Sequence, residues 1–241
     1  MYLGMNMAIE PFSVGLVSET GDVLANLTQV SSRQFSENIM DEIEQLCEKI
    51  GESVHRLKGV CVAEGPGSYT GLRMSVVTAK TIGQVLNIPI VGLSTLEGLV
   101  QSYQGIDGIY FAMVPAVGNE MNVAMFSICQ QHVKRLTPDF IMTKEALLKA
   151  LPKFKEPIIC LGILPKDMMQ KLNTEQCPLS FINQTLDGTV LATYVQQKKH
   201  TDDGSSWQKI FPKYSHMPSI IDRKSTRLNS SHQIISYAVF C

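Results

Sequence analysis

The sequence predicts an α/β protein of two similar halves, each a mixed sheet flanked by helices. Short apolar runs with the character of strands alternate along the chain with longer segments of helical periodicity. The order of these segments in the first half recurs, more weakly, in the second, as it would in a duplicated fold. A strand, a glycine loop and a helix follow one another directly between Val60 and Leu86, and we expect the first half to be organised around them.

The first half is predicted to hold three strands and then three helices that alternate with two further strands. Residues 19–22 have the composition of a hairpin turn between the second and third strands. Ser36 can cap the first helix, which has one apolar stripe of residues three or four apart. In chain order the expected elements are strands at 1–9, 12–18 and 23–30, a helix at 37–50, a strand at 58–63, a helix at 71–86, a strand at 90–93 and a helix at 95–102.

The second half begins after a polar, glycine-bearing segment at 103–108. We therefore predict an N-terminal domain of residues 1–104 and a C-terminal domain of residues 105–221. Residues 222–241 are set apart as an artefactual or disordered tail, because they are similar to translated adapter or vector sequence; a genuine extension is the alternative. The expected elements are strands at 109–114, 123–128 and 132–136, a helix at 144–151, a strand at 157–161, a helix at 165–172, a strand at 179–182 and a helix at 189–199.

Composition and charge favour a protein with a packed core that does not hold nucleic acid by itself. Of its 241 residues, 44% are hydrophobic and 18% are charged. The net charge of −1 argues against a module that binds nucleic acid directly, because phosphate contacts need clustered lysine and arginine. The six cysteines form no Cys-x-x-Cys pair, as expected of reduced, buried thiols. Without a long apolar span or a signal-like start, the sequence predicts a cytoplasmic protein.

The loop after the central strand, from Glu64 to Gly71, matches no nucleotide-binding motif. A P-loop places a lysine after its last glycine, where this chain has Leu72, and a dinucleotide loop is one residue shorter. We favour a rigid turn that delivers a helix onto a sheet, with Thr70 as the helix cap, over a phosphate cradle, and both interpretations stay open here. The residues that could contact a ligand in this loop are Gly65, Pro66, Gly67, Ser68, Thr70, Gly71 and Arg73.

The helix that follows is apolar on more than one side. One stripe of apolar or small residues runs along it, and Met74, Val77 and Val85 fall on a different side. Either the helix is buried within its own domain, or one face docks a second protein. Arg73 opposes the helix dipole near the helix start, so we expect it to serve a carboxylate, a carbonyl or a phosphate outside its own helix.

Three stretches carry a resemblance to a known family, namely residues 65–73 (GPGSYTGLR), 78–80 (TAK) and 87–97 (NIPIVGLSTLE). They closely resemble the bacterial TsaB (YeaZ) family, which acts in making the threonylcarbamoyladenosine modification of tRNA. The resemblance implies a two-domain actin-like fold, of the Hsp70-like (ASKHA, ribonuclease-H-like) architecture. It also implies a non-catalytic subunit that is required for threonylcarbamoyl transfer to adenine 37 and that binds and activates a TsaD-like subunit.

The resemblance further implies where the partner binds and what else takes part. In this family the helices at 37–50 and 71–86 form the subunit interface, a TsaE-like ATPase joins the pair, and the chain forms a homodimer when the partner is missing. No tightly bound cofactor is expected, and ATP or ADP would lie at the subunit interface. The expected partner-binding residues are Ser36, Met40, Ile43, Cys47, Gly71, Met74, Ser75, Thr78, Ala79 and Ile82.

The chain departs from the family pattern at the end of its first strand. Asn6 and Met7 stand where the family has an Asp-Thr-Ser-like phosphate loop, and an amide and a thioether cannot replace a carboxylate and a hydroxyl. No two histidines have the His-x-x-x-His spacing of a metal pair, so we predict neither a metal nor a catalytic residue. The alternative function is a small ATPase or kinase of the same fold, with Gly65 to Gly71 cradling phosphate.

Overall fold

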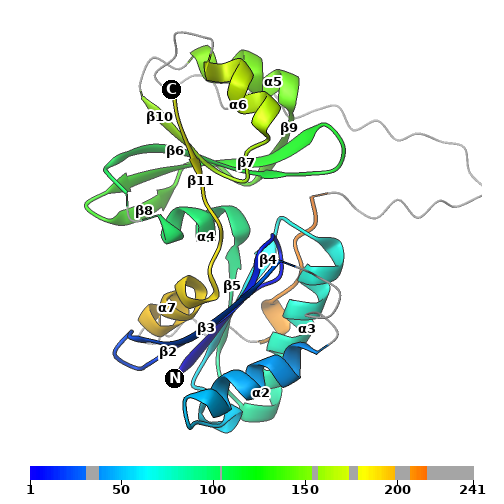
Figure 1. The fold of residues 1–241 in the computed structure, drawn as a ribbon, viewed down its shortest axis with the longest axis vertical. Helices are drawn as coiled ribbons and strands as arrows, with labels where there is room; N and C mark the ends of the chain where they lie inside the picture. The colour runs from blue at the N-terminus through cyan, green and yellow to red at the C-terminus, as the bar shows by residue number, and fades with distance from the viewer. Residues whose placement is uncertain (31–37, 104, 154–156, 174–178, 199–206, 216–241) are drawn as a thin grey trace, which may run out of the picture.

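The computed structural model describes the chain except for residues 31–37, 104, 154–156, 174–178, 199–206 and 216–241 (Figure 1). The described residues form two lobes, each built on one mixed sheet and lying one above the other along the long axis (Figure 1). The predicted α/β class with two similar halves is confirmed. The predicted tail at 222–241 and the predicted helix cap Ser36 lie outside the described residues.

The first sheet contains β1 (Tyr2–Asn6), β2 (Phe12–Val17), β3 (Val23–Gln29), β4 (Val60–Gly65) and β5 (Ile90–Ser94). Their order is β3-β2-β1-β4-β5, with an antiparallel half at β3, β2 and β1 and a parallel half at β4 and β5. β1, β2 and β4 are buried along their whole length. Because both faces of these strands are covered, their sequences read as nearly unbroken apolar runs.

The second sheet repeats this plan. It contains β6 (Gly108–Pro115), β7 (Glu120–Cys129), β8 (His132–Arg135), β9 (Phe140–Thr143), β10 (Ile158–Gly162) and β11 (Leu179–Asn183). Its strand order is β11-β10-β6-β7-β8. Read from β8, this order matches the first sheet: β8, β7, β6, β10 and β11 take the places of β3, β2, β1, β4 and β5. The antiparallel and parallel pairings also correspond. The duplication expected from the sequence is therefore present. β9, which pairs with β7, is an addition that the sequence did not predict.

Helices cover both faces of the first sheet and the outer face of the second (Figure 1). α2 (Ile39–Lys49) and α3 (Tyr69–Leu86) share one core with the first sheet, and α5 (Lys144–Ala150) and α6 (Lys166–Asn173) pack on the second. α4 (Thr95–Ser102) and α7 (Gly188–Lys198) lie in a core shared by both sheets. Three short 3₁₀ turns complete the list: η1 (Val54–Arg56), η2 (Leu151–Lys153) and η3 (Trp207–Lys209). Among the described helices, none has the length and apolar character needed to cross a membrane.

A glycine contact fixes α7 on the first sheet. Gly4 and Gly15 stand directly opposite each other on β1 and β2, and the backbone at Gly188 lies against both of them. A methyl group on any of the three would overlap backbone atoms of another segment. The Oγ of Ser13 also accepts a hydrogen bond from the Gly188 amide at 2.6 Å. The missing side chains therefore let a helix from the second half of the chain lie directly on a sheet of the first.

This packing crosses the boundary between the two predicted domains, and the division itself stays a prediction. Residues 105–221 were expected to form the second domain, but Gly188–Lys198 packs on β1, β2 and β4 of the first sheet. The segment at 207–215 returns to the same lobe, where Ile210 enters the core beneath α2 and α3. The lobe built on the first sheet thus contains chain from both predicted domains.

The reactivity of the cysteines tests which parts of the chain are buried in this structure. Cys47, Cys61 and Cys160 are buried, and Cys129 is exposed. Burial raises the pKa of Cys47 to about 11 and that of Cys160 to about 12, and it also raises the pKa of Cys61. At about pH 8 we expect a thiol reagent to label Cys129 quickly and the three buried thiols only after unfolding. Peptide mass mapping measures this, with Cys129→Ser as the control; fast labelling of Cys61 in the native protein would contradict the packing.

Candidate functional site

The glycine loop between β4 and α3 is packed tightly against other segments of the chain. A methyl group on Gly65 would overlap the carbonyl oxygen of Lys213, and one on Gly67 would overlap that of Ala8. A methyl group on Gly71 would overlap the carbonyl oxygen of Met7. These three glycines are required because backbone from the β1–β2 turn and from the C-terminal segment passes directly over the loop.

Amides at Ser68, Gly71 and Leu72 are also engaged within the chain. The Ser68 amide donates to the carbonyl of Ala8 at 2.7 Å, and the Leu72 amide donates to the carbonyl of Ser68 at 2.9 Å. The Ser68 Oγ accepts from the Gly71 amide at 3.3 Å and caps α3, so the expected cap at Thr70 is wrong by two positions. Pro66 has no amide hydrogen to offer. The geometry favours the rigid turn over the phosphate cradle.

Asn6 ties the β1–β2 turn to the loop that leads into α7. It is fully buried, and its Nδ2 donates to the carbonyls of Ile9, Pro11 and Leu186 at 3.0, 3.1 and 2.8 Å. Its Oδ1 accepts from the amides of Ala8 and Ile9 at 3.1 and 3.3 Å. An amide is the group that can both donate and accept in this way. Asn6, which departs from the family pattern, therefore has partners for both the nitrogen and the oxygen of its side-chain amide.

Most of the residues expected to bind a partner belong to the core of this chain. On α2, Ile43 and Cys47 are buried, and only Met40 reaches the surface in part. On α3, Met74 is half-buried, and the remaining predicted contacts face inward. The buried members are Ile43, Cys47, Gly71, Ser75, Thr78, Ala79 and Ile82. The expected partner contacts stay a prediction. Within this chain, small and weakly polar residues such as Ser75 fit into the close packing of α3 on its own sheet, where the Ser75 Oγ donates to the Leu72 carbonyl.

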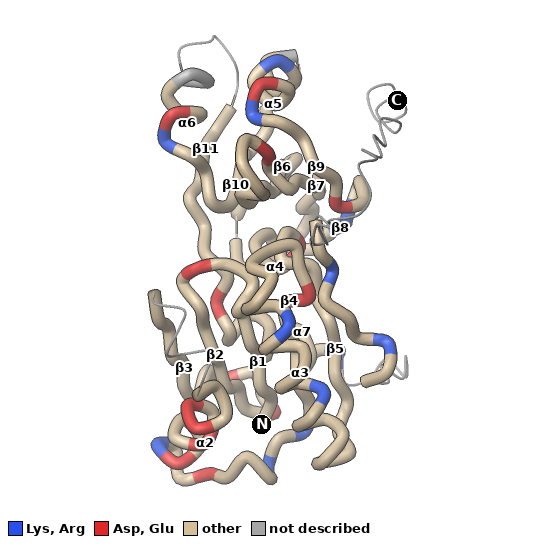
Figure 2. Tube along the Cα trace, turned by 90° about the vertical axis from the view of Figure 1, so that its right-hand side faces the viewer, with Lys and Arg blue, Asp and Glu red and all other residues tan. Residues whose placement is uncertain are grey.

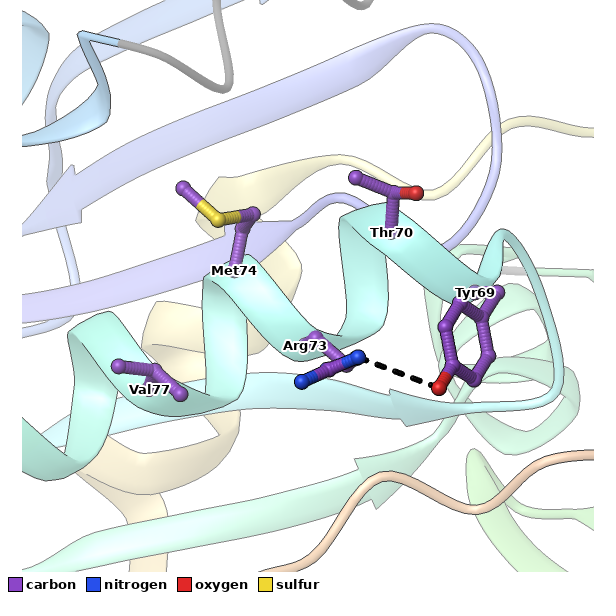
Figure 3. Close-up of a pocket in the computed structure, with 5 residues that line it drawn as sticks. All are labelled: Tyr69, Thr70, Arg73, Met74 and Val77. Atoms are coloured by element: carbon purple, nitrogen blue, oxygen red, sulfur yellow. Dashed lines mark hydrogen bonds between the residues drawn. The ribbon is translucent and has the colours of Figure 1, made fainter.

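The outer side of α3 is formed by other residues of the helix. Val77 and Val85 are 61% and 72% exposed, although both are large apolar side chains. A hollow of about 280 Å³ lies near the start of the helix (Figure 3). Its lining residues are Tyr69, Thr70, Arg73, Met74 and Val77. We call this exposed side, Tyr69 to Val85, the outer side of α3.

Arg73 is held in this hollow by tyrosine side chains. Its Nη1 donates to the Tyr69 hydroxyl at 3.2 Å (Figure 3), and its guanidinium carbon lies 5.4 Å from the centre of the Tyr69 ring. The Tyr69 ring contacts that of Tyr214, with centroids 4.7 Å apart. Burial raises the pKa of Tyr214, and the Arg73 charge opposes this rise. Because α3 begins at Tyr69, Arg73 lies beyond the first turn, where the helix dipole has little effect.

The segment at 207–215, which we call the C-terminal strap, runs along α3 and the glycine loop (Figure 1). The Phe211 ring lies 4.1 Å from the Lys80 ammonium group, and the Lys213 amide donates to the Glu64 carbonyl at 2.6 Å. The Lys213 ammonium group also pairs with the Glu64 carboxylate. The sequence contained a weak signal for this segment, a Pro-x-Tyr ending similar to that of the TsaB family, but nothing that placed it against α3.

A second, polar cavity of about 360 Å³ lies between the lobes, and the sequence did not predict it. Arg135 of β8 reaches Glu97 of α4 at 3.1 Å and also pairs with Asp139. The Ser94 Oγ donates to the second oxygen of Asp139 at 2.9 Å. Burial alone would lower the pKa of Arg135, but its bonds to Asp139 and Glu97 raise it. The charges of Arg135, Glu97 and Asp139 are thus paired with one another, and this network of ion pairs and hydrogen bonds joins the two lobes.

The part of the chain that the structure describes contains no cluster of three or more histidine, cysteine or acidic residues that could hold a metal ion. His55 and His132 are both exposed and belong to different lobes. The fold and the site together define a two-lobed α/β protein with a closed glycine loop and an exposed helix side.

Comparison with known proteins identifies the family. Residues 23–175 match the family described as "TsaD: tRNA N6-adenosine threonylcarbamoyltransferase". The TsaB protein of Bacillus subtilis is 27% identical over 140 residues, which is 58% of this chain and 61% of that protein. A tRNA N6-adenosine threonylcarbamoyltransferase of Koribacter versatilis is 30% identical over 95 residues, 37% of this chain and 25% of that protein. The matched parts are thus less than two thirds of the length of these relatives.

A solved structure titled "YeaZ from Pseudomonas aeruginosa" covers 88% of this chain and 98% of its own, with a TM-score of 0.74 and 18% identity. At this identity the likeness concerns the fold, which is the two-lobed actin-like architecture expected from the sequence. The chain belongs to the threonylcarbamoyltransferase family, in its TsaB (YeaZ) branch.

Proposed function

We propose that this chain is a non-catalytic partner subunit in the synthesis of threonylcarbamoyladenosine on tRNA. In this role it binds a TsaD-like subunit through α2 and the outer side of α3 and holds that subunit in its active shape for transfer to adenine 37. Family membership supports the pathway, since relatives carry the names TsaB and tRNA N6-adenosine threonylcarbamoyltransferase. The tRNA is then contacted through the partner.

The observation that carries the proposal is the exposure of two large apolar side chains, Val77 and Val85, on the outer side of α3. Two large apolar side chains on one helix side, beside a tyrosine and an arginine, have the composition of a protein interface. α2 and α3 lie on the same face of the first sheet (Figure 1). A pair of helices from a related subunit would complete a helical bundle over them.

The enzymatic alternative, a small ATPase or kinase, is less well supported. It needs the loop from Gly65 to Gly71 to receive phosphate groups, and backbone at Met7, Ala8 and Lys213 occupies the space beside its glycines. We therefore propose that ATP or ADP, where it takes part, binds at the interface with the partner. A TsaE-like ATPase would join the assembled pair, and the same helix surface would hold a homodimer together when the partner is missing.

Replacing Val77 with aspartate tests the proposed docking surface. We expect the affinity for a TsaD-like subunit of the same source to fall by about 10- to 100-fold, because a charged side chain would replace an apolar one at the interface. Fold stability should change little, since the side chain is exposed. Size-exclusion chromatography with light scattering, together with a tRNA modification assay, measures the effect.

The matched control is Val23→Asp, because Val23 on β3 is 62% exposed and belongs to a different element. It should form the complex like the wild type. If Val77→Asp binds the TsaD-like subunit as tightly as Val23→Asp and supports the same modification, the outer side of α3 is not the docking surface and the proposal is lost.

A further inference from the structure

The two helices of the proposed docking surface carry opposite charges. Asp41, Glu44 and Glu48 on α2 are exposed, and acidic positions are frequent along this helix (Figure 2). α3 contains no acidic residue between Tyr69 and Leu86, and its charges are the basic groups of Arg73 and Lys80. Since both helices cover the same face of the first sheet, a partner that lies across them meets one acidic and one basic strip.

Arg73 stands out among the arginines of the described residues. Arg56 and Arg135 both pair with carboxylates, whereas Arg73 has no carboxylate within 4.0 Å in the described part of the chain. Its contact is the neutral hydroxyl and ring of Tyr69, which Tyr214 supports from the C-terminal strap. A guanidinium group has five N–H donors, so most of them stay available in the hollow of Figure 3. Tyr69 thus positions the guanidinium group before any partner arrives, and Tyr214 packs on the Tyr69 ring.

We infer that the partner subunit places a carboxylate side chain on Arg73 and basic side chains along the acidic side of α2; this inference rests on the proposed function. Docking over α3 would remove water from Arg73, and burying a charge without a partner is strongly unfavourable. A carboxylate from the partner compensates this cost and accepts a bidentate hydrogen bond from the fork of N–H groups. Thr70, Met74 and Val77 line the rest of the hollow, which gives a single carboxylate side chain an otherwise neutral and mainly apolar setting.

Charge complementarity of this kind fixes the orientation of the partner. A helix pair that presented its acidic residues to α2 would bring like charges together, and this arrangement is disfavoured. The basic strip of the partner must therefore lie over Asp41, Glu44 and Glu48, and its carboxylate over Arg73. The pattern is also self-complementary about a two-fold axis, so a second copy of this chain is the competing occupant.

The test measures the dissociation constant of the complex with the TsaD-like subunit by calorimetry, at about 0.05, 0.15 and 0.5 M salt. Arg73→Glu should weaken binding about tenfold or more at low salt and reduce the dependence on salt. Arg73→Lys should bind with intermediate affinity, because an ammonium group cannot form the bidentate pair. The double variant Glu44→Lys, Glu48→Lys should also weaken binding. Lys134→Glu is the control for the change of charge, because Lys134 is exposed on β8 in the other lobe.

Each outcome separates the inference from the proposed function. If Val77→Asp weakens the complex and Arg73→Glu binds like Lys134→Glu, the inference fails and the proposed docking surface stands. If Val77→Asp also leaves the affinity for the TsaD-like subunit unchanged, the proposed function fails, and the inference that rests on it fails too. Loss of self-association in Arg73→Glu with an unchanged complex would assign the pattern to a second copy. Binding of ATP by the isolated chain that disappears in Arg73→Glu would make the anion a phosphate, and that result would also overturn the inference.

Discussion

Changing Asn6 to aspartate is expected to lower the free energy of unfolding by about 2–5 kcal/mol at neutral pH. In the native protein the Nδ2 of Asn6 faces three carbonyl oxygens, from Ile9, Pro11 and Leu186. An aspartate oxygen in its place would carry negative charge toward the same three oxygens in a fully buried site. The substitution is nearly isosteric, so its cost comes from the charge and the lost hydrogen bonds rather than from packing.

The effect of Asn6→Asp should depend on pH in a defined direction. Burial and the three carbonyl oxygens would raise the pKa of the new carboxyl group above its value in the unfolded chain. The variant is then least destabilised below about pH 4, where the carboxyl is protonated in both states, and loses stability as the pH rises. Urea unfolding at several pH values, each compared with the wild type, measures this. Asn183→Asp, an exposed control, should change stability by less than about 0.5 kcal/mol.

An Asn6→Asp protein as stable as the wild type at pH 7 would show that this side chain is not held as described. Such a result would also reopen the phosphate-loop interpretation, because a carboxylate is what the family pattern has at this position.

Gly67→Val should destabilise the protein by about 3 kcal/mol or more, or prevent folding. Even the first carbon of the new side chain would overlap the carbonyl oxygen of Ala8. That oxygen cannot move freely, because it accepts the amide hydrogen of Ser68 at 2.7 Å. Thermal unfolding in the absence of any nucleotide measures the loss. Gly108→Val is the matched control, since a Cβ at Gly108 meets open space.

The same variant separates the two interpretations of the glycine loop. If the loop were a phosphate cradle, Gly67→Val would fold normally and lose ATP binding. Should Gly67→Val fail to fold, Ser68→Ala gives a milder test: it removes the cap of α3 and should cost about 1 kcal/mol while the fold persists. A stable Gly67→Val protein with normal melting would contradict the packing of the β1–β2 turn on this loop.

The glycines of this chain serve close approach between distant segments. Gly67 and Gly71 receive the β1–β2 turn, and Gly4 and Gly15 receive the start of α7. In the first place the start of α3 meets a turn, and in the second the start of α7 meets two strands, both at backbone distance. A glycine motif that resembles a ligand-binding loop can therefore be needed for close packing instead. The backbone that lies beside the glycines shows which of the two roles applies.

The sequence by itself determined the class of fold and the order of its elements. Strand and helix periods are local properties, so the segments at 12–18, 71–86 and 90–93 could be recognised without knowledge of their neighbours. The duplication was visible for the same reason, because each half repeats one local order. The helical period also places Val77 and Val85 on a different side of the helix from its main apolar stripe.

Only the tertiary structure decided which side of α3 is exposed and what Asn6 does. Ser75 and Thr78 are polar enough to suggest a surface, yet they are buried because α3 lies close to its sheet. The return of α7 and of the C-terminal strap to the first lobe joins residues more than a hundred positions apart, and no local pattern records such contacts. The role of Asn6 likewise depends on the carbonyl of Leu186, which only the folded chain brings within reach.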